Sequence, residues 1–494
     1  MASATPAPYT PAAYTALLQG VPASSIYING GFVETAARHK VFGKADGALI
    51  AECGYAAAKD IDSAVIAART AFRGWSGKPP AERARVLQAM AAALQTRFRE
   101  FVALESHHGG KTIADAEIDI RAGIATLQWF AGCAERLDGR VVASAESIHR
   151  FVRREALGVC SLILPWNFPL LLMIWKLAPA LASGNTVVVK PASETPLSTL
   201  AFAALASAAG LPAGVFNVTP GPGRDIGMAL ATHPGVSKVS FTGSTEVGLQ
   251  VAQAAAKSAK RVTLELGGKS PAVICDDADL ERAVIGTAAG VFGHAGQKCA
   301  ARTRCIVMES VADEVVEKLV ARAKLLKTGN PMDAATTLGP VINKAAQQKI
   351  LDYCDGGVSE GAKLVCGGGA PAGLAGPYVE ATIFDHAGNH MKIAREEIFG
   401  PVLAVIRVKD MDEAIAVAND SDYGLAATVW TRSLARGHQL AAKIEAGTVS
   451  VNTPAVIGIE MPFGGYKMSG YGRELGVEGM DAYLQHKSVV MDIT

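Results

Sequence analysis

Hydrophobic residues change their spacing along the chain, from a helical period in the early region to short continuous runs further on. Two early sets repeat every four to seven residues: Ile61, Val65 and Phe72, and then Val86, Met90 and Leu94. Residues at these intervals share one side of a helix. The early region is therefore predicted to supply amphipathic helices.

The later apolar runs are short and each is followed by a Gly or Pro turn and usually by a helical segment. The first series covers residues 186–189, 215–218, 236–241 and 262–266. The second series covers residues 272–275, 304–308, 402–408, 427–430 and 448–452. This alternation is typical of βαβ units with a parallel sheet, so we predict two successive α/β domains.

One uncharged segment of twenty residues, 156–175, has the length that spans a bilayer. Pro165, Asn167 and Pro169 interrupt it. Proline inside a helix removes a backbone hydrogen bond and clashes with the preceding turn. We therefore predict a buried strand over residues 158–164, a loop and then a helix, and no membrane span.

Composition is that of a globular protein with a large core: 494 residues, 50% hydrophobic and 19% charged. The net charge of +1 gives no electrostatic reason to expect nucleic acid or an anionic membrane as a partner. The eight cysteines include no C-x-x-C pair and no grouping with histidine that suits zinc, so we expect reduced thiols and no metal. The uncharged N-terminal segment lacks the features of a targeting signal, so residues 1–20 are predicted to form a flexible tail and the protein to be cytoplasmic.

Cys299 and Glu265 are the strongest candidates for chemistry. Cys299 lies in the Gly-containing stretch 292–300, and Glu265 precedes Gly267 and Gly268. Glycine lets a backbone approach a ligand closely, and the two side chains pair a potential thiolate nucleophile with a potential general base. This pair indicates an enzyme.

Two Gly-rich turns follow predicted strands and are candidates for nucleotide binding. The first, Gly221 to Gly227, has the spacing G-x-G-x-x-x-G, one residue longer than the dinucleotide fingerprint. The second, Gly243-Ser244, stands at a strand-to-helix junction where free backbone amides favour a phosphate. Each could be an ordinary turn, but their succession within one α/β domain favours a nucleotide.

Seven motifs, in order and at matching spacing, make the chain resemble the NAD(P)-dependent aldehyde dehydrogenases over nearly its whole length. They are Pro165-Trp166-Asn167-Phe168-Pro169, Lys190-Pro191, Phe241-Thr242-Gly243-Ser244, Leu264-Glu265-Leu266-Gly267-Gly268-Lys269, Gly296-Gln297-x-Cys299, Glu397-Ile398-Phe399-Gly400-Pro401 and Pro462-Phe463-Gly464-Gly465.

The resemblance implies an α/β fold with a Rossmann-like cofactor domain, a catalytic α/β domain and a small oligomerisation β element built from a hairpin and the C-terminal strand. On this basis residues 21–122 and 142–266 are assigned to the cofactor domain and 267–470 to the catalytic domain. Residues 123–141 and 471–494 are assigned to the oligomerisation element. A homo-oligomer is expected, a tetramer or alternatively a dimer.

The family mechanism implies roles for five residues. Cys299 would attack the aldehyde carbonyl, and Asn167 with the backbone N–H of Cys299 would hold the oxyanion. Glu265 would activate the water that hydrolyses the thioester. Lys190 would bind the adenosine ribose, and Glu474 would assist proton movement or form only a surface salt bridge.

The same resemblance implies the cofactor and substrate sites. NAD or NADP would contact Trp166, Lys190, Ser193, Gly223, Gly243, Ser244, Glu265, Leu266, Gly267, Glu397 and Phe399. The substrate would contact Phe168, Leu171, Leu172, Trp175, Gly293, Lys298, Ile457 and Phe463. Most of these substrate positions are apolar or aromatic, which favours a medium to large hydrophobic or aromatic aldehyde.

Departures from the family pattern bear on specificity. Ser193 stands where many NAD-preferring members carry a glutamate. A serine lacks the negative charge that would repel a 2′-phosphate, so the cofactor could be either NAD or NADP. Gly293 replaces a bulky aromatic and should widen the substrate tunnel. Lys298 either contacts an acidic substrate or points into solvent, and Arg302 replaces a common glycine.

Other functions stay open as alternatives. A semialdehyde dehydrogenase acting on an acidic substrate would use the same nucleophile, but its CoA-acylating relatives typically lack the glutamate present at Glu265. A cysteine-dependent esterase could use Cys299, with His294 only five residues away, although so close a histidine is more often incidental. A non-catalytic protein would be free to lose Cys299, Glu265 or Asn167.

Overall fold

The first series of apolar runs forms the centre of an eight-stranded sheet, ordered β2-β1-β9-β8-β7-β10-β11-β21. The five strands from β9 to β11 are parallel, and the outer strands are antiparallel. The strands are β1 (Ser25–Ile28), β2 (Gly31–Glu34), β7 (Val159–Ile163), β8 (Thr186–Lys190), β9 (Phe216–Val218), β10 (Lys238–Thr242), β11 (Arg261–Glu265) and β21 (Gly470–Tyr471). The predicted parallel sheet is confirmed.

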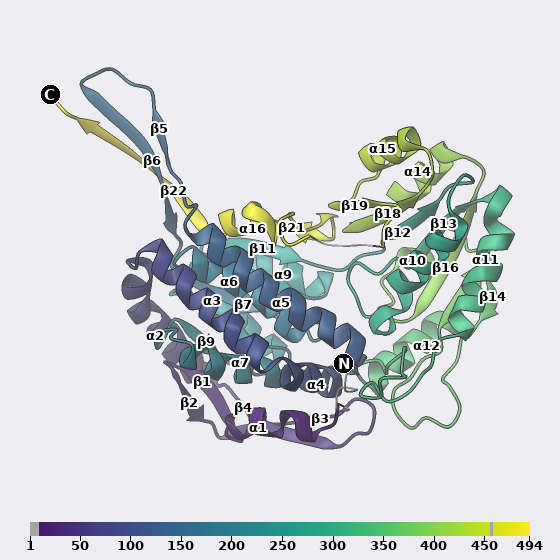
Figure 1. Ribbon diagram of the computed structural model, residues 1–494, viewed down its shortest axis with the longest axis horizontal. Coiled ribbons are helices and arrows are strands. Elements are labelled where there is room, and N and C mark those ends of the chain that lie inside the picture. The colour runs from purple at the N-terminus through teal and green to yellow at the C-terminus, as the bar shows by residue number, and fades with distance from the viewer. Residues whose placement is uncertain (1–8, 455–457) are drawn as a thin grey trace, which may run out of the picture.

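Helices cover both faces of this sheet (Figure 1). One face carries α6 and α7, with α1, α3, α4 and α5 stacked outside them, and the other carries α2, α8 and α9. In β7, Cys160 and Leu162 face the first layer, and Val159 and Ile163 face the second. Because strands buried on both faces need apolar residues at every position, the sequence shows continuous runs instead of alternation. The helices are α1 (Ala12–Gln19), α2 (Ala58–Ser76), α3 (Pro80–Thr96), α4 (Phe98–Gly109), α5 (Ile113–Ala134), α6 (Pro169–Ala182), α7 (Leu197–Ala208), α8 (Met228–Thr232) and α9 (Thr245–Ala256).

The second series of runs forms a seven-stranded sheet, ordered β14-β15-β16-β13-β12-β18-β19, that is parallel except for β14. Its strands are β12 (Pro271–Ile274), β13 (Arg304–Met308), β14 (Lys363–Cys366), β15 (Thr382–Asp385), β16 (Val402–Val408), β18 (Ala426–Trp430) and β19 (Thr448–Val451). Helices on one face are α10 (Leu280–Phe292), α11 (Glu309–Lys324) and α12 (Lys344–Ser359), and on the other α14 (Met411–Asn419) and α15 (Leu434–Lys443). Two successive α/β units are therefore present, as predicted.

The computed structural model describes residues 9–454 and 458–494. In it, a three-stranded antiparallel arm projects from the first unit (Figure 1). It consists of β5 (Arg140–Val142), β6 (Ile148–Ala156) and β22 (Leu484–Asp492). The expected C-terminal strand is confirmed, and it pairs along its whole length with β6 of the same chain. Smaller elements complete the fold: β3 (Ala37–Phe42), β4 (Leu49–Tyr55), β17 (Tyr423–Gly424), β20 (Tyr466–Lys467), α13 (Lys392–Arg395) and α16 (Gly476–Asp481).

Two expected boundaries need correction. Residues 123–134 of the expected oligomerisation element belong to helix α5, where Ile124 and Leu127 are buried against the neighbouring helices. The hairpin of the arm lies further on, in β5 and β6. Its strands are exposed, and even Val141 and Val142 face solvent. No buried face therefore imposes an alternation of apolar and polar residues that sequence analysis could detect. Residues 470–481 also differ from expectation, because β21 joins the first sheet and α16 packs on α6.

The predicted N-terminal tail is wrong for residues 12–19, which form α1. Tyr14 and Leu17, three residues apart, are buried against α4 and α7. The Tyr14 hydroxyl lies 2.5 Å from His107 Nδ1. The absence of charge misled the prediction, because this segment is ordered by apolar contacts instead.

The path of the chain places the candidate site between the two sheets. β11 ends at Glu265 and β12 begins at Pro271, so the chain passes from the carboxyl edge of the first sheet to the amino edge of the second. In the first sheet the strand order reverses between β7 and β10. Ligands of open α/β sheets bind at the carboxyl ends of strands where this reversal occurs.

Replacing Leu17 by Ala tests whether α1 is docked. Removing a buried leucine side chain destabilises its packing by about 2–5 kcal/mol, which should release a helix of eight residues. We expect faster protease cleavage within the first 20 residues, followed by mass spectrometry, with Ala16→Ser as the exposed control on the same helix. Equal cleavage of all three proteins would show that the segment is already undocked.

Candidate active site

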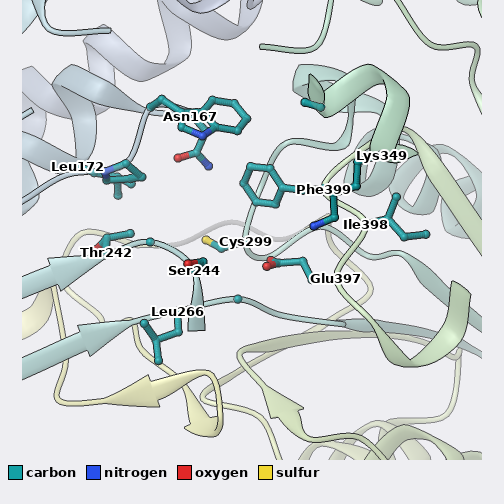
Figure 2. A pocket seen from close by; sticks show the side chains of 15 residues that line it. Asn167, Leu172, Thr242, Ser244, Leu266, Cys299, Lys349, Glu397, Ile398 and Phe399 are labelled. Carbon is teal, nitrogen blue, oxygen red and sulfur yellow. The ribbon is translucent and has the colours of Figure 1, made fainter. Parts of the chain in front are cut away.

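A cavity of about 270 Å³ opens where the two sheets meet, and Cys299 lies in its wall (Figure 2). Residues after β7 and β10 form one side, and residues before β16 and from α12 form the other. The lining consists of Pro165, Trp166, Asn167, Leu172, Thr242, Gly243, Ser244, Leu266, Gly267, Cys299, Ala346, Lys349, Glu397, Ile398 and Phe399. Thus a candidate nucleophile from the second unit faces the place in the first sheet where the strand order reverses.

The loop that carries Cys299 has an unusual backbone. After α10 ends, His294, Ala295 and Gly296 all have positive φ angles, of 53°, 51° and 73°. Left-handed conformations are strained for residues with a Cβ and collect at functional sites. At Gly296 even a Cβ is excluded, because it would lie 2.0 Å from the carbonyl oxygen of Gly400.

Gln297 holds this loop in place. Its side-chain oxygen accepts a hydrogen bond from the Ile342 N–H at 2.8 Å, and its amide donates to the His294 carbonyl at 3.2 Å. The side chain is fully buried. Sequence reasoning used Gln297 only as part of a motif, whereas the structure shows it as the anchor of the loop.

Asn167 lies beside the nucleophile. Phe168, which follows it, precedes the proline that begins α6, and Asn167 itself is 3% exposed. Its Nδ2 donates to the Gln297 carbonyl at 2.9 Å. An amide nitrogen has two hydrogens, so one remains to serve a group bound in the cavity.

Glu265 ends β11 and is buried, and its carboxylate lies against Gly464. A Cβ at Gly464 would lie 2.8 Å from Glu265 Oε1, so this approach requires glycine. Within the described part of the chain, neither carboxylate oxygen accepts a hydrogen bond. Burial raises the pKa of Glu265 to about 8, although Lys176 and Arg473 act in the opposite direction.

Cys299 is half-buried in the same region. Burial raises its pKa to about 12, and the nearby carboxylates of Glu265 and Glu397 add to the rise. The thiol is therefore protonated at neutral pH before any ligand binds. Once it is deprotonated, a carboxylate whose pKa is raised toward that of a thiol is a better acceptor for the proton of that thiol.

Glu474 pairs with Lys176, a residue that sequence reasoning missed. The two side chains form a buried ion pair, with Glu474 only 5% exposed, so the surface salt bridge considered for Glu474 is wrong. Lys176 extends from α6, one residue after Trp175. The available signal was a single charged residue inside an otherwise apolar helix.

Seven of the predicted cofactor residues line the cavity: Trp166, Gly243, Ser244, Leu266, Gly267, Glu397 and Phe399. Glu397 Oε1 accepts a hydrogen bond from the Gly268 N–H at 3.0 Å, and a Cβ at Gly267 would lie 2.4 Å from Glu397 Oε2. Phe399 packs edge-on against Trp166, with ring centroids 5.3 Å apart. Ser244 caps the N-terminus of α9.

Of the other predicted cofactor residues, Glu265 ends β11, and Lys190, Ser193 and Gly223 lie at or after the ends of β8 and β9. Ser193 Oγ donates to the Gly221 carbonyl at 3.3 Å. Lys190 Nζ lies 3.8 Å from the place where a Cβ of Gly223 would be. Burial lowers the pKa of Lys190 to about 8. A cavity lined by glycines, with a buried amine beyond it, fits an extended phosphate-containing ligand such as a dinucleotide.

The predicted substrate residues form an apolar group next to Cys299. Trp175 and Phe463 pack edge-on at 5.6 Å, and Phe168 packs edge-on against His294 at 5.5 Å. Leu171 and Leu172 are buried in the same core, and Leu172 also reaches the cavity. Ile457 lies outside the described residues.

Lys298 and Arg302 both form hydrogen bonds within the protein. Lys298 Nζ donates to the Ala289 carbonyl at 3.0 Å and fills the space beside Gly293, where a Cβ would lie 2.9 Å from it. The wider tunnel expected from Gly293 is therefore partly occupied. Arg302 is buried and donates from Nε to Thr428 Oγ1 at 3.0 Å, which supports the loop from behind.

Further residues organise the site without a recognisable signal in the sequence. Ser469 Oγ donates to the Gly267 carbonyl at 2.7 Å and accepts from the Gly424 N–H at 3.0 Å. Ala346 and Lys349 reach the cavity from α12, almost fifty residues after Cys299 in the chain. Only the packing of the two units brings them there.

Comparisons with known proteins identify the family that the chain resembles. A sequence profile of the aldehyde dehydrogenase family matches residues 32–489. Aldehyde dehydrogenase 1A1 of Rattus norvegicus is 47% identical over 440 residues, which is 88% of each chain. Among the described residues, no helix combines the length and hydrophobicity required to cross a membrane.

Solved structures show the same fold. An aldehyde dehydrogenase from Bacillus cereus in complex with NAD+ superposes with a TM-score of 0.95 at 39% identity, covering 97% of this chain and 98% of that one. An indole-3-acetaldehyde dehydrogenase in complex with NAD+ gives 0.95 at 39%, covering 98% and 99%. An NADP-dependent enzyme from E. coli gives 0.93 at 36%, covering 95% and 98%.

Alkylation of Cys299 by iodoacetamide tests the state of the thiol. Because the thiolate reacts and the pKa is raised to about 12, the rate should rise about tenfold per pH unit from pH 7 to 9.5 without levelling off. Mass spectrometry would follow the modified peptide, with Cys299→Ser as the control for background from half-buried Cys366. A plateau below pH 9 would show that the thiolate is already stabilised in the free protein.

Proposed function

The chain belongs to the aldehyde dehydrogenase family, and from this premise we propose that it oxidises a medium to large hydrophobic or aromatic aldehyde to the carboxylic acid through Cys299. It is an NAD(P)-dependent aldehyde dehydrogenase. The observation that carries the proposed mechanism is the position of Cys299. It shares one cavity with Asn167 and adjoins Glu265, which is buried and has a raised pKa.

The cofactor is NAD or NADP, as in the solved relatives. When bound, it supplies a hydride acceptor. We assign Glu397 and Phe399 to the nicotinamide end of the cavity, Ser244 to the pyrophosphate and Lys190 to the adenosine ribose. The glycines at 243 and 267 leave room for the cofactor between these groups.

In the first chemical step, Glu265 acts in its deprotonated form, and the Cys299 sulfur forms a bond to the aldehyde carbon as its proton passes to this carboxylate. The carbonyl oxygen becomes an oxyanion, which the free N–H of Asn167 and the backbone N–H of Cys299 stabilise. Donors already fixed in a site with little water stabilise developing charge strongly. Asn167 is fixed in this way by its bond to the Gln297 carbonyl. Loss of hydride leaves a thioester on Cys299.

In the second step, Glu265 removes a proton from water, which attacks the thioester carbon. The carbon–sulfur bond breaks, Glu265 returns that proton to the Cys299 sulfur, and the carboxylic acid leaves. Between the two steps, Glu265 must release to solvent the proton that it took from Cys299. The buried pair of Lys176 and Glu474, whose Lys176 ammonium interacts electrostatically with Glu265, is proposed to assist that transfer.

The substrate class rests on the apolar group beside the nucleophile. Phe168, Leu172, Trp175 and Phe463 offer aromatic and aliphatic surface to a bulky aldehyde. Lys298, the cation that an acidic substrate would need, is held against the Ala289 carbonyl. One relative of known structure is named for indole-3-acetaldehyde, an aromatic substrate.

We also propose that the enzyme is a cytoplasmic homo-oligomer, a tetramer or alternatively a dimer. The projecting arm exposes Val141, Val490, Met491 and Ile493. Exposed apolar strands with a free sheet edge favour pairing with another chain. The cytoplasmic assignment is supported by eight free cysteines and by a mouse relative named cytosolic aldehyde dehydrogenase 1.

Cofactor reduction by purified protein tests the proposed function. Aliphatic, aromatic and semialdehyde substrates are compared with each cofactor, and NAD(P)H is followed at its absorbance maximum. We expect the highest kcat/KM with aromatic or long aliphatic aldehydes. Cys299→Ala should abolish reduction, whereas Cys305→Ala, in buried strand β13, should keep it if the variant folds. A preference for acidic semialdehydes would contradict the proposed substrate class.

The pH dependence of kcat tests the role of Glu265. A base must be deprotonated, and burial raises the pKa of Glu265 to about 8, so kcat should rise about tenfold per unit below pH 8 and level off above it. Glu265→Gln should lower kcat by about 10²- to 10⁴-fold, and it should also slow the first turnover, because Glu265 accepts the Cys299 proton in the first step. Glu317→Gln, on the exposed side of α11, is the matched control. An unchanged pH profile in Glu265→Gln would exclude Glu265 as the base.

A further inference from the structure

A row of polar side chains crosses the first sheet on the face that α6 and α7 cover. Its members occupy alternate positions on β10 and β11, and the intervening residues Val239, Phe241 and Leu264 pack in the apolar core of the other face. The register pairs Lys238 with Arg261, Ser240 with Thr263, and Thr242 with Glu265. Central strands of a sheet that is covered on both faces are normally apolar throughout. This polar row, which begins at Glu265, therefore requires a separate explanation.

Lys238 is the member of the polar row that packing explains least. Its side chain is 1% exposed, and Nζ donates to Thr263 Oγ1 at 3.1 Å and lies 4.8 Å from the centre of the Tyr483 ring. Across residues 9–454 and 458–494 it forms no ion pair with a carboxylate. Lysine is almost never fully buried unless it is paired, and an unpaired buried charge weakens a fold. A role in chemistry explains such a residue better than a role in packing.

The groups that face Lys238 leave its amine able to change charge. Cys160 faces it from β7, and burial raises the pKa of that thiol to about 12, so the thiol is neutral. Burial raises the pKa of Tyr483, after α16, in the same way. Lys176 approaches from α6 and Arg261 from β11, so none of these four neighbours is a carboxylate. Burial lowers the pKa of Lys238 to about 8, and Arg261 adds to the fall. Near pH 8 this amine can both accept and release a proton.

Lys176 links Lys238 to the active site. It interacts electrostatically with both Glu265 and Lys238, and it forms the buried ion pair with Glu474. Once that pair is set apart, the groups on either side of Lys176 are Glu265 and Lys238. A proton that passes from Glu265 to Lys238 leaves the total charge of this buried region unchanged. Because net charge is costly to bury, transfer inside the region is easier than direct loss of the proton.

The polar row continues from Lys238 to the solvent-exposed edge of the sheet. Lys238 and Arg261 are the first residues of β10 and β11, and Arg261 is exposed. Thr263 Oγ1 donates to Ser240 Oγ at 3.1 Å, and Ser240 also contacts the Tyr483 hydroxyl. Hydroxyl groups both donate and accept hydrogen bonds, so they hold the Lys238 amine without fixing its charge. The active-site end and the solvent end of the row are therefore joined through one amine.

We propose that Lys238 is a positioning residue for proton release. It receives, through Lys176, the proton that Glu265 took from Cys299, and it passes that proton to water at the amino edge of the sheet. The O–H bond of Glu265 breaks as an N–H bond forms at Lys176, and Lys176 gives one of its own protons to the Lys238 nitrogen. Lys238 lies outside the cavity lining and acts through Glu265. The inference rests on the proposed function, because without thioester chemistry there is no proton to release.

Replacement of Lys238 by Met tests this with stopped-flow and steady-state kinetics on the intact enzyme. The first turnover of NAD(P)H formation should stay within about twofold of wild type, and kcat should fall about tenfold or more, because only the steps after hydride transfer wait for Glu265 to lose its proton. Lys257→Met, at the exposed C-cap of α9, is the matched control and should change neither rate. The melting temperature of Lys238→Met should not fall, since the variant loses an unpaired buried amine.

The pH profile and the response to buffer separate proton transfer from a structural role. Lys238→Gln keeps a hydrogen-bond donor for Thr263 but accepts no proton, so it should be as slow as Lys238→Met. In both variants hydroxide must take the proton from Glu265 directly. Their kcat should therefore keep rising above pH 8, where wild type is expected to level off. Imidazole at constant pH and ionic strength should raise kcat of both variants severalfold and leave wild type unchanged.

Three results would overturn the inference: wild-type kcat in both variants, a lowered kcat with an unchanged pH profile and no effect of imidazole, or loss of folding in both variants. If wild type oxidises aldehydes and any of these results is found, the inference fails and the proposed function stands. If wild type oxidises no aldehyde with either cofactor, the proposed function fails first, and the inference fails with it because Lys238 has no proton to carry.

Discussion

The close approach of three glycines to their neighbours where the two sheets meet controls the geometry of the whole site. Gly267 lies against Glu397, Gly268 lies 2.4 Å (measured to a Cβ placed on it) from the Cys299 carbonyl, and Gly464 lies against Glu265. At each position a side chain would separate the two units. Two of these contacts join a glycine to a carboxylate side chain, and the third joins Gly268 to the backbone of Cys299. The nucleophile, the base and the cofactor cavity therefore keep their positions relative to one another.

Burial of ionisable groups is the second consequence of this junction. The carboxyl of Glu265 and the thiol of Cys299 are removed from water, which raises the pKa of each, and the Glu265 carboxylate raises the pKa of Cys299 further. Removal of charged groups from water is unfavourable unless they are paired or neutral. Lys176 and Glu474 satisfy that requirement by pairing, and Glu265 and Cys299 by holding their protons. The site is therefore neutral at rest, and reaction requires the deprotonated form of Glu265, which accepts the Cys299 proton.

The elements that were misjudged share a physical reason. The apolar residues of α5 do not show in the sequence which part of the fold the segment belongs to. Its packing between α3 and α6 shows that it belongs to the core. The strands of the arm are exposed, so no burial constrains their pattern. In α1, two buried side chains order a segment that composition alone describes as a tail. The spacing of apolar residues in the sequence reflects burial of one face of an element. This signal is weakest where the element is short or exposed.

The sequence by itself determined the two parallel sheets, because strands buried on both faces must be continuously apolar, and it determined the identity of the reactive groups, because thiol, carboxylate and amide occur in recognisable motifs. It did not determine their states. That Glu474 pairs with Lys176, that Lys298 turns back to the Ala289 carbonyl, and that Glu194 is held by Lys44 and Asn343 depend on partners 298, 9, 150 and 149 residues away in the chain. Only the tertiary structure decides these pairings, because charge and burial act through distance in space and not through distance along the sequence.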